Sequence, residues 1–299
     1  MIPGLRVNLG PLVLPNPVLA AAGTFGYGIE FAPAVRVAEL GAIITKTITV
    51  EPRAGNPPPR LLETPSGMLN AVGLQNVGLE AFLRDKLPQV LRLPAPIIVS
   101  VLGERAEEIE QLCRALDATG VHGIELNLSC PNIHRRHGPE AQGGLMVSQD
   151  PVTTGEFVAA ARAATRKPLI AKLTPDVTDI RPIVQAAERA GADILSLCNT
   201  YTGMSLDPVT GHSRIGSPTG GLSGPAIRPL SLYRLWRARE AVRCPLIGVG
   251  GIVTVDDVLE YFHAGASAVA IGTGTFAHPD TAVRVARGLR RHFERQGTA

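Results

Sequence analysis

The sequence contains little cysteine, and its few cysteines are scattered. Four occur among 299 residues: Cys113, Cys130, Cys198 and Cys244. None shows the C-x-x-C spacing by which neighbouring ligands hold zinc or an iron–sulfur cluster, so we expect no metal site in this chain. Sparse thiols without a pairing pattern are typical of a reducing compartment, which predicts a cytoplasmic location.

The chain carries little net charge, and we expect neither a signal peptide nor a membrane span. Its formal net charge is +3, and its arginines are spread along the sequence rather than gathered in one basic block, which argues against a nucleic-acid partner. The N-terminus has no charged stretch followed by an apolar one, and no apolar run approaches the ~20 residues of a membrane helix. We therefore expect a protein that acts away from the membrane.

What the sequence does have is many glycines and prolines between short apolar runs. With 32 Gly, 25 Pro and 45% hydrophobic residues, it favours one globular domain with many tight connections. Eight apolar runs have the length of buried strands and lie at residues 18–23, 42–48, 96–102, 123–129, 168–174, 193–199, 245–250 and 268–273. Helical patterns accompany them at residues 30–40, 79–92, 104–119, 153–166, 178–190, 227–242, 254–264 and 280–295. Eight alternating strands and helices predict a parallel (β/α)8 barrel, the TIM barrel, over residues 1–299.

Three connections, at residues 49–78, 130–152 and 200–226, are longer than a simple barrel needs. All three follow strands, so we expect them at the face where such barrels keep their chemistry. The strand at 123–129 stops before Pro131, which places Cys130 where that strand opens into a loop. A lone cysteine is more often an inert core residue, but the flanking Asn127 and Asn132 are costly to bury without polar partners and favour a polar ligand.

Two lysines and two glycine-rich turns indicate an anion site. Lys46 and Lys172 stand in strands that are otherwise apolar, so each needs an anion or a polar cavity; the alternative is an ion pair with an interior acid such as Glu125. The last two strands end in glycine-rich turns at residues 248–251 and 272–274, whose backbone N–H groups can approach a phosphate closely.

Four segments carry a family resemblance: residues 68–76, 127–132, 221–226 and 248–252. Through these motifs, which occur in the same order, the chain resembles the class 1 dihydroorotate dehydrogenases over nearly its whole length. The resemblance implies an FMN-dependent oxidation of dihydroorotate to orotate in pyrimidine biosynthesis. It implies that Cys130 is the base that removes the C5 proton, that Lys172 stabilises the reduced flavin, and that Lys46 contacts both the flavin and the substrate carboxylate.

The resemblance also implies two sets of binding residues. Those expected to contact FMN are Thr24, Lys46, Thr47, Ser100, Asn127, Lys172, Cys198, Gly224, Gly250, Gly251, Gly272 and Thr273. Those expected to contact the substrate are Lys46, Asn70, Ala71, Val72, Gly73, Leu74, Asn127, Asn132, Asn199 and Thr200.

Within class 1, residues 51–57 and 73–76 look like subtype 1B. In that subtype a homodimer of catalytic subunits joins subunits that carry FAD and a 2Fe-2S cluster, giving a heterotetramer that passes electrons to NAD. The stretch 133–142 is longer than is usual for the subtype, which leaves a fumarate-linked, class 1A-type oxidation as an alternative.

Three other functions compete with this interpretation. A dihydropyrimidine dehydrogenase would reduce uracil or thymine on a similar FMN barrel, and recognition of the substrate carboxylate separates it from the dihydroorotate enzymes. A tRNA dihydrouridine synthase has a similar cysteine motif but should show a basic face or an added helical domain. A barrel that binds a phosphorylated ligand without catalysis is the third.

Overall fold

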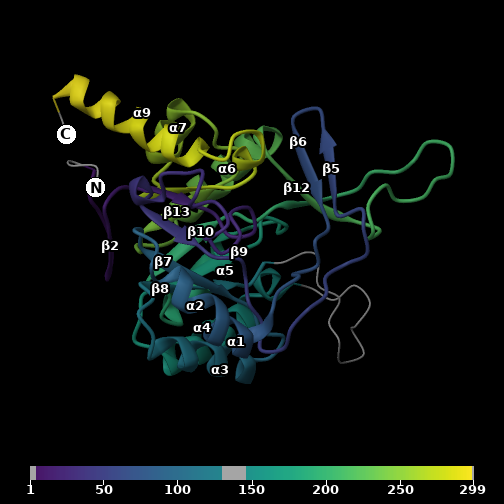
Figure 1. Cartoon of the computed structure of the whole chain (residues 1–299), viewed down its shortest axis with the longest axis horizontal. Coiled ribbons are helices and arrows are strands. Elements are labelled where there is room, and N and C mark those ends of the chain that lie inside the picture. The colour runs from purple at the N-terminus through teal and green to yellow at the C-terminus, as the bar shows by residue number, and fades with distance from the viewer. Residues whose placement is uncertain (1–4, 130–145, 298–299) are drawn as a thin grey trace.

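The computed structural model describes residues 5–129 and 146–297, and its centre is a closed barrel of eight parallel strands (Figure 1). The strands are β3 (Val18–Ala20), β4 (Ala42–Ile44), β7 (Ile97–Val101), β8 (Gly123–Asn127), β9 (Leu169–Leu173), β10 (Ile194–Leu197), β13 (Leu246–Val249) and β14 (Ala268–Ile271). Each pairs with the next along the chain, and β14 pairs with β3 to close the ring. The predicted (β/α)8 barrel is confirmed, with each strand inside the range expected for it.

One end of the barrel is filled with apolar side chains. A hairpin of β1 (Val7–Leu9) and β2 (Leu12–Leu14) precedes the first barrel strand, and its Leu9 packs in one cluster with Ile98 and Ile170 of the barrel. Because apolar side chains fill this end, we expect the ligand site at the opposite end, where the strands terminate.

Helices surround the barrel. They are α1 (Gly78–Ala81), the π-helical η2 (Phe82–Lys86), α2 (Leu87–Val90), α3 (Ala106–Asp117), α4 (Pro151–Ala164), α5 (Arg181–Arg189), α6 (Arg228–Arg239), α7 (Val255–His263), α8 (Gly274–Ala277) and α9 (Thr281–Gln296), with 3-10 turns η3 (Val147–Gln149) and η4 (Pro225–Ile227). No described helix is long and apolar enough to cross a membrane.

The prediction of a helix at residues 30–40 is wrong. The segment forms turns and a single 3-10 turn, η1 (Val37–Glu39). Pro33 has no backbone N–H to donate and disfavours helical backbone at the preceding residue, which explains why the apolar spacing here did not produce a helix.

Two of the long connections meet in a second sheet that stands beside the barrel mouth (Figure 1). The hairpin of β5 (Leu61–Thr64) and β6 (Gly67–Asn70) pairs with β12 (Gly220–Ser223), which in turn pairs with β11 (Tyr201–Gly203). All pairs are antiparallel, and Asn70 lies opposite Gly221. The sheet therefore brings the predicted substrate loop to the end of β10.

Candidate active site

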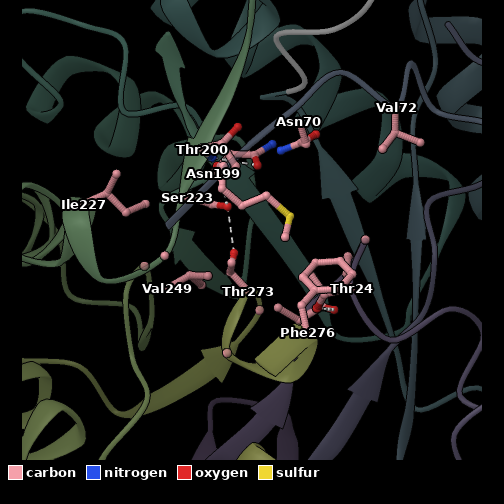
Figure 2. Close-up of a pocket in the computed structure, with 18 of the residues that line it drawn as sticks. Thr24, Asn70, Val72, Asn199, Thr200, Ser223, Ile227, Val249, Thr273 and Phe276 are labelled. Atoms are coloured by element: carbon pink, nitrogen blue, oxygen red, sulfur yellow. Dashed lines mark hydrogen bonds between the residues drawn. The ribbon is translucent and has the colours of Figure 1, made fainter. Parts of the chain in front are cut away.

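A cavity of about 360 Å³ opens where the barrel strands end, within the size range of small-molecule sites (Figure 2). Most residues predicted to form the site line it. These are Thr24, Lys46, Thr47, Asn70, Val72, Gly73, Leu74, Asn127, Lys172, Cys198, Asn199, Thr200, Gly224, Gly250, Gly251, Gly272 and Thr273.

Four predicted residues are not among this lining. Ser100 is fully buried, and its Oγ lies 2.9 Å from Oγ1 of the cavity residue Thr47. Ala71 packs in a small cluster with Leu69 and Ile215. Cys130 and Asn132 lie outside the described residues.

The cavity also has apolar lining that the sequence reasoning did not single out. Leu61 and Met68 come from the second sheet, and Phe276 comes from α8. A hairpin signal at Pro65 and Ser66, between two strand-like runs, could have indicated β5 and β6, but nothing local shows that they turn toward the cavity.

One wall of the cavity is built from polar side chains at the ends of β4, β8 and β9. Asn127 lies opposite Lys172 in the strand register. Its Nδ2 donates to Thr47 Oγ1 at 3.2 Å, and its Oδ1 accepts from Ser129 Oγ at 3.1 Å, which fixes the orientation of the amide. Thr47 Oγ1 lies 2.9 Å from Ser100 Oγ, so the network continues into the barrel interior.

Further asparagines hold the end of β10 against the neighbouring segments (Figure 2). Asn199 Nδ2 donates to the carbonyl oxygen of Ser129 at 2.9 Å and to its Oγ at 3.0 Å, while Asn199 Oδ1 accepts from the backbone N–H of Thr200 at 2.8 Å. Asn70 Nδ2 donates to the carbonyl oxygen of Gly221 at 3.0 Å. These bonds fix the orientation of amides that would otherwise rotate.

Two lysines make this wall positive. Burial lowers the pKa of Lys46, and the nearby Arg60 lowers it further while Glu30 opposes both. Lys172 is buried at the cavity floor. The interior ion pair that the sequence allowed is not formed: within the described chain Glu125 Oε1 lies 3.1 Å from Ser100 Oγ, and its second carboxyl oxygen has no hydrogen-bond partner. Both lysines can therefore act on a ligand.

The opposite wall is backbone. At Gly251, φ is +70°, and a Cβ there would lie 2.6 Å from the Cβ of Arg228, so only glycine fits. Gly272 follows β14, and Thr273 donates its hydroxyl to Ser223 Oγ at 2.7 Å (Figure 2). Exposed peptide N–H groups in the turns after the seventh and eighth strands are suited to a phosphate.

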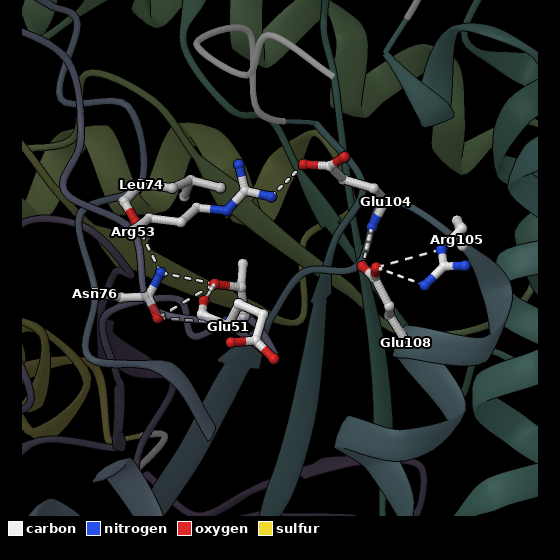
Figure 3. Close-up of polar contacts among 8 residues, drawn as sticks. Glu51, Arg53, Leu74, Asn76, Glu104, Arg105 and Glu108 are labelled. Atoms are coloured by element: carbon white, nitrogen blue, oxygen red, sulfur yellow. Dashed lines mark hydrogen bonds and ion pairs between the residues drawn. The ribbon is translucent and has the colours of Figure 1, made fainter. Parts of the chain in front are cut away.

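Hydrogen bonds of Asn76 fix the loop that carries the predicted substrate contacts (Figure 3). Leu74 has φ of +56°, a left-handed conformation unusual for leucine. Asn76 Nδ2 donates to the Leu74 carbonyl oxygen at 2.8 Å and to Thr49 Oγ1 at 3.0 Å, and its Oδ1 accepts from the Gly78 N–H at 2.9 Å. Asn76 was not predicted as a site residue, yet it fixes the conformation of the loop.

The fold is a (β/α)8 barrel with a cavity where its strands end. One wall of this cavity suits a planar polar ligand, and the other suits an anionic or phosphorylated one. The sequence model of the family described as dihydroorotate dehydrogenase matches residues 4–293. The chain belongs to this family and is an oxidoreductase of dihydroorotate, which confirms the resemblance that its motifs indicated.

Individual relatives agree with the family match. A Pelobacter propionicus protein named dihydroorotate dehydrogenase B (NAD(+)), catalytic subunit, is 49% identical over 300 residues, covering 100% of this chain and 96% of the relative. A Trichlorobacter lovleyi protein of the same name is 46% identical with the same coverage. A Solibacter usitatus protein provisionally named dihydroorotate dehydrogenase A (fumarate) is 45% identical over 298 residues, covering 99% of this chain and 96% of the relative.

Proposed function

We propose that the whole chain is one FMN-binding catalytic subunit that oxidises dihydroorotate to orotate in the cytoplasm and passes the electrons to NAD through a partner subunit. The observation that carries this proposal is the division of the cavity: charged and amide side chains form one wall, and glycine backbone forms the other. A flavin needs both, because its ring system has a polar edge and its tail ends in a phosphate.

The residues present fit FMN. The turns at Gly250, Gly251 and Gly272 would hold the phosphate, with the hydroxyl of Thr273 beside them. Thr47 and Lys172 would face the polar edge of the ring. When bound, FMN would supply the acceptor for the hydride that leaves C6 of the substrate.

The chain itself would bind the substrate and remove its proton. Lys46 would pair with the substrate carboxylate, while Asn70 and Asn199, with Asn132, would bind the pyrimidine ring. Cys130, as a thiolate, would take the C5 proton while the hydride leaves C6, which leaves orotate with its new C5–C6 double bond. Burial raises the pKa of the Cys198 thiol to about 12, which favours Cys130 over Cys198 as the base.

The partner is proposed from the names of the relatives. A protein named a catalytic subunit implies another subunit, and we expect it to carry FAD and a 2Fe-2S cluster in a heterotetramer built around a homodimer of this chain. The provisional fumarate name of the Solibacter relative favours direct reduction of fumarate as the second candidate.

Electron-acceptor assays on the purified chain loaded with FMN test this proposal. Dihydroorotate should bleach the flavin in stopped-flow mixing, and an artificial dye should reoxidise it, whereas NAD and fumarate should do so poorly. NAD reduction by the isolated chain at the dye-coupled rate would contradict the need for a partner. Efficient fumarate reduction would establish the second candidate, and bleaching by dihydrouracil but not by dihydroorotate would indicate the dihydropyrimidine activity.

A further inference from the structure

Glu125 is a buried acid that the proposed mechanism does not use. It lies on β8 inside the barrel and is only 1% exposed. Its Oε1 lies 3.1 Å from Ser100 Oγ, and its Oε2 has no hydrogen-bond partner in the described part of the chain. Burial raises the pKa of Glu125, an effect that exceeds the attraction of the neighbouring Lys172 on β9. A carboxylate with a single hydrogen bond is costly in such a place, so the neutral acid is favoured.

The neutral acid must donate its O–H, and the described residues offer one acceptor, Ser100 Oγ. A buried hydroxyl without an acceptor costs more than an unpaired carbonyl oxygen, because the latter loses only part of its bonding capacity. The proton therefore belongs on Oε1, which lies 3.1 Å from Ser100 Oγ. With Glu125 neutral, Ser100 Oγ becomes the acceptor of this hydrogen bond. Ser100 then donates its own hydrogen to Thr47 Oγ1 at 2.9 Å.

The direction of these bonds decides what Thr47 offers to the cavity. Thr47 Oγ1 already accepts from Asn127 Nδ2, so a second donor, Ser100, fills both of its acceptor positions. Its hydrogen is then left to point into the cavity, which Thr47 lines. Were Glu125 ionised, Ser100 would have to donate to it, Thr47 would donate to Ser100, and only a lone pair would face the cavity.

We propose that the proton on Glu125 sets the direction of the Glu125–Ser100–Thr47 chain and so makes Thr47 a hydrogen-bond donor to an acceptor atom of the bound flavin. Glu125 is thus a positioning residue that acts on the ligand through two hydroxyl groups. The flavin as recipient rests on the proposed function, whereas the proton on Glu125 does not.

Infrared spectroscopy tests the proton directly. The difference spectrum between the native chain and Glu125→Gln, both without FMN, should show the C=O stretch of a neutral carboxylic acid, unchanged between about pH 6 and pH 9, where an ordinary glutamate is ionised. Absence of that band would overturn the proposal. Should the variant fail to fold, carbon-13 NMR of the native chain with labelled glutamate carboxyls replaces it: one signal must stay at the neutral-acid position over the same range, and a full set of carboxylate signals would be contrary.

A matched pair at Thr47 tests the recipient. Thr47→Val removes the hydroxyl and should weaken FMN binding roughly 3- to 10-fold, the range for one hydrogen bond, and shift the infrared bands of the bound flavin. Thr47→Ser keeps the hydroxyl and should leave affinity and bands close to native. Equal FMN affinity and unshifted bands in Thr47→Val would overturn donation by Thr47. Failure of the native chain to bind FMN would overturn that donation together with the proposed function, while the carboxyl band still decides the state of Glu125.

Discussion

The two walls of the cavity offer different groups to a ligand. On the wall from β4, β8 and β9, side chains such as Lys172 and Asn127 present charges and oriented amides. On the wall from β13 and β14, Gly251 and Gly272 present peptide groups and leave room. Protonation and the direction of hydrogen bonds can change which groups the side-chain wall offers to a ligand. A substitution in the backbone wall can only fill its space. Under the proposed function, chemistry would lie on the side-chain wall and phosphate anchoring on the backbone wall.

The largest expected effect is on the chemistry side. Cys130→Ser should slow dihydroorotate-dependent flavin reduction on the order of 100-fold or more, the scale for losing a positioned base, because a serine hydroxyl does not ionise in the range where a thiol does. Stopped-flow bleaching measures the rate, and FMN affinity should stay native because Cys130 is proposed to act on the substrate rather than on the flavin. A native rate of bleaching would remove Cys130 from the mechanism.

The backbone wall should respond in the opposite way. At Gly272→Ala the new Cβ would lie 3.7 Å from the side chains of Ala21 and Thr24, an ordinary contact, so the chain should fold normally. The methyl group would occupy space proposed for the phosphate and should cost ~1–3 kcal/mol of binding, roughly 5- to 150-fold in the dissociation constant of FMN. Fluorescence titration measures this loss.

A matched glycine supplies the control for that variant. Gly155 lies in α4, where the nearest heavy atom to a new Cβ is 4.0 Å away, the carbonyl oxygen of Ala186. Gly155→Ala should therefore keep native FMN affinity. Equal FMN affinity in Gly272→Ala and Gly155→Ala would mean that the phosphate lies elsewhere.

A third variant separates charge from anchoring within the side-chain wall. Lys172→Met removes a positive charge at the cavity floor and should make the reduced flavin harder to form. The flavin midpoint potential should fall by roughly 30 mV, equivalent to about 1.4 kcal/mol for a two-electron couple. Lys172→Arg keeps the charge, so the midpoint potential should fall less in that variant. An unchanged or raised potential in Lys172→Met would mean that Lys172 does not act on the flavin.

Elements set by local sequence patterns were predictable, whereas contacts between distant segments were not. The eight barrel strands were predictable because buried parallel strands read as continuous apolar runs between turn residues. The glycine wall was predictable too, since its residues follow the last two strands directly. The second sheet was not, because β6 and β12 join segments whose contact between Asn70 and Gly221 spans 151 residues. Local patterns carry no information on such a pairing.

Side-chain direction was the other quantity that the sequence could not supply. Ser100 is fully buried, and its Oγ lies 2.9 Å from Oγ1 of Thr47, which lines the cavity. Its predicted contact with the flavin stays a prediction. Asn76 lies in a predicted motif, but its role in holding Leu74 depends on hydrogen bonds to two separate segments. The predicted roles of Cys130 and Asn132 stay predictions, because both lie outside the described residues.

The smallest expected effect is at a point remote from both walls. Glu39, in η1, accepts hydrogen bonds from Arg287 of α9 at 2.6 and 2.7 Å, joining the first and last parts of the barrel. The hydrogen bonding of Arg287 lowers the pKa of Glu39, more than burial raises it. The pair therefore stabilises the fold at pH values above the ordinary glutamate pKa, about 4.3, and this stabilisation is lost as the pH falls through the lowered value.

Glu39→Gln should slightly lower the urea midpoint of unfolding at pH 7, and the difference from native should shrink toward zero in acid, with FMN affinity and flavin potential unchanged. A difference that persists in acid would mean that Glu39 acts through packing rather than charge, and a change in FMN affinity would show that the walls are coupled to barrel closure.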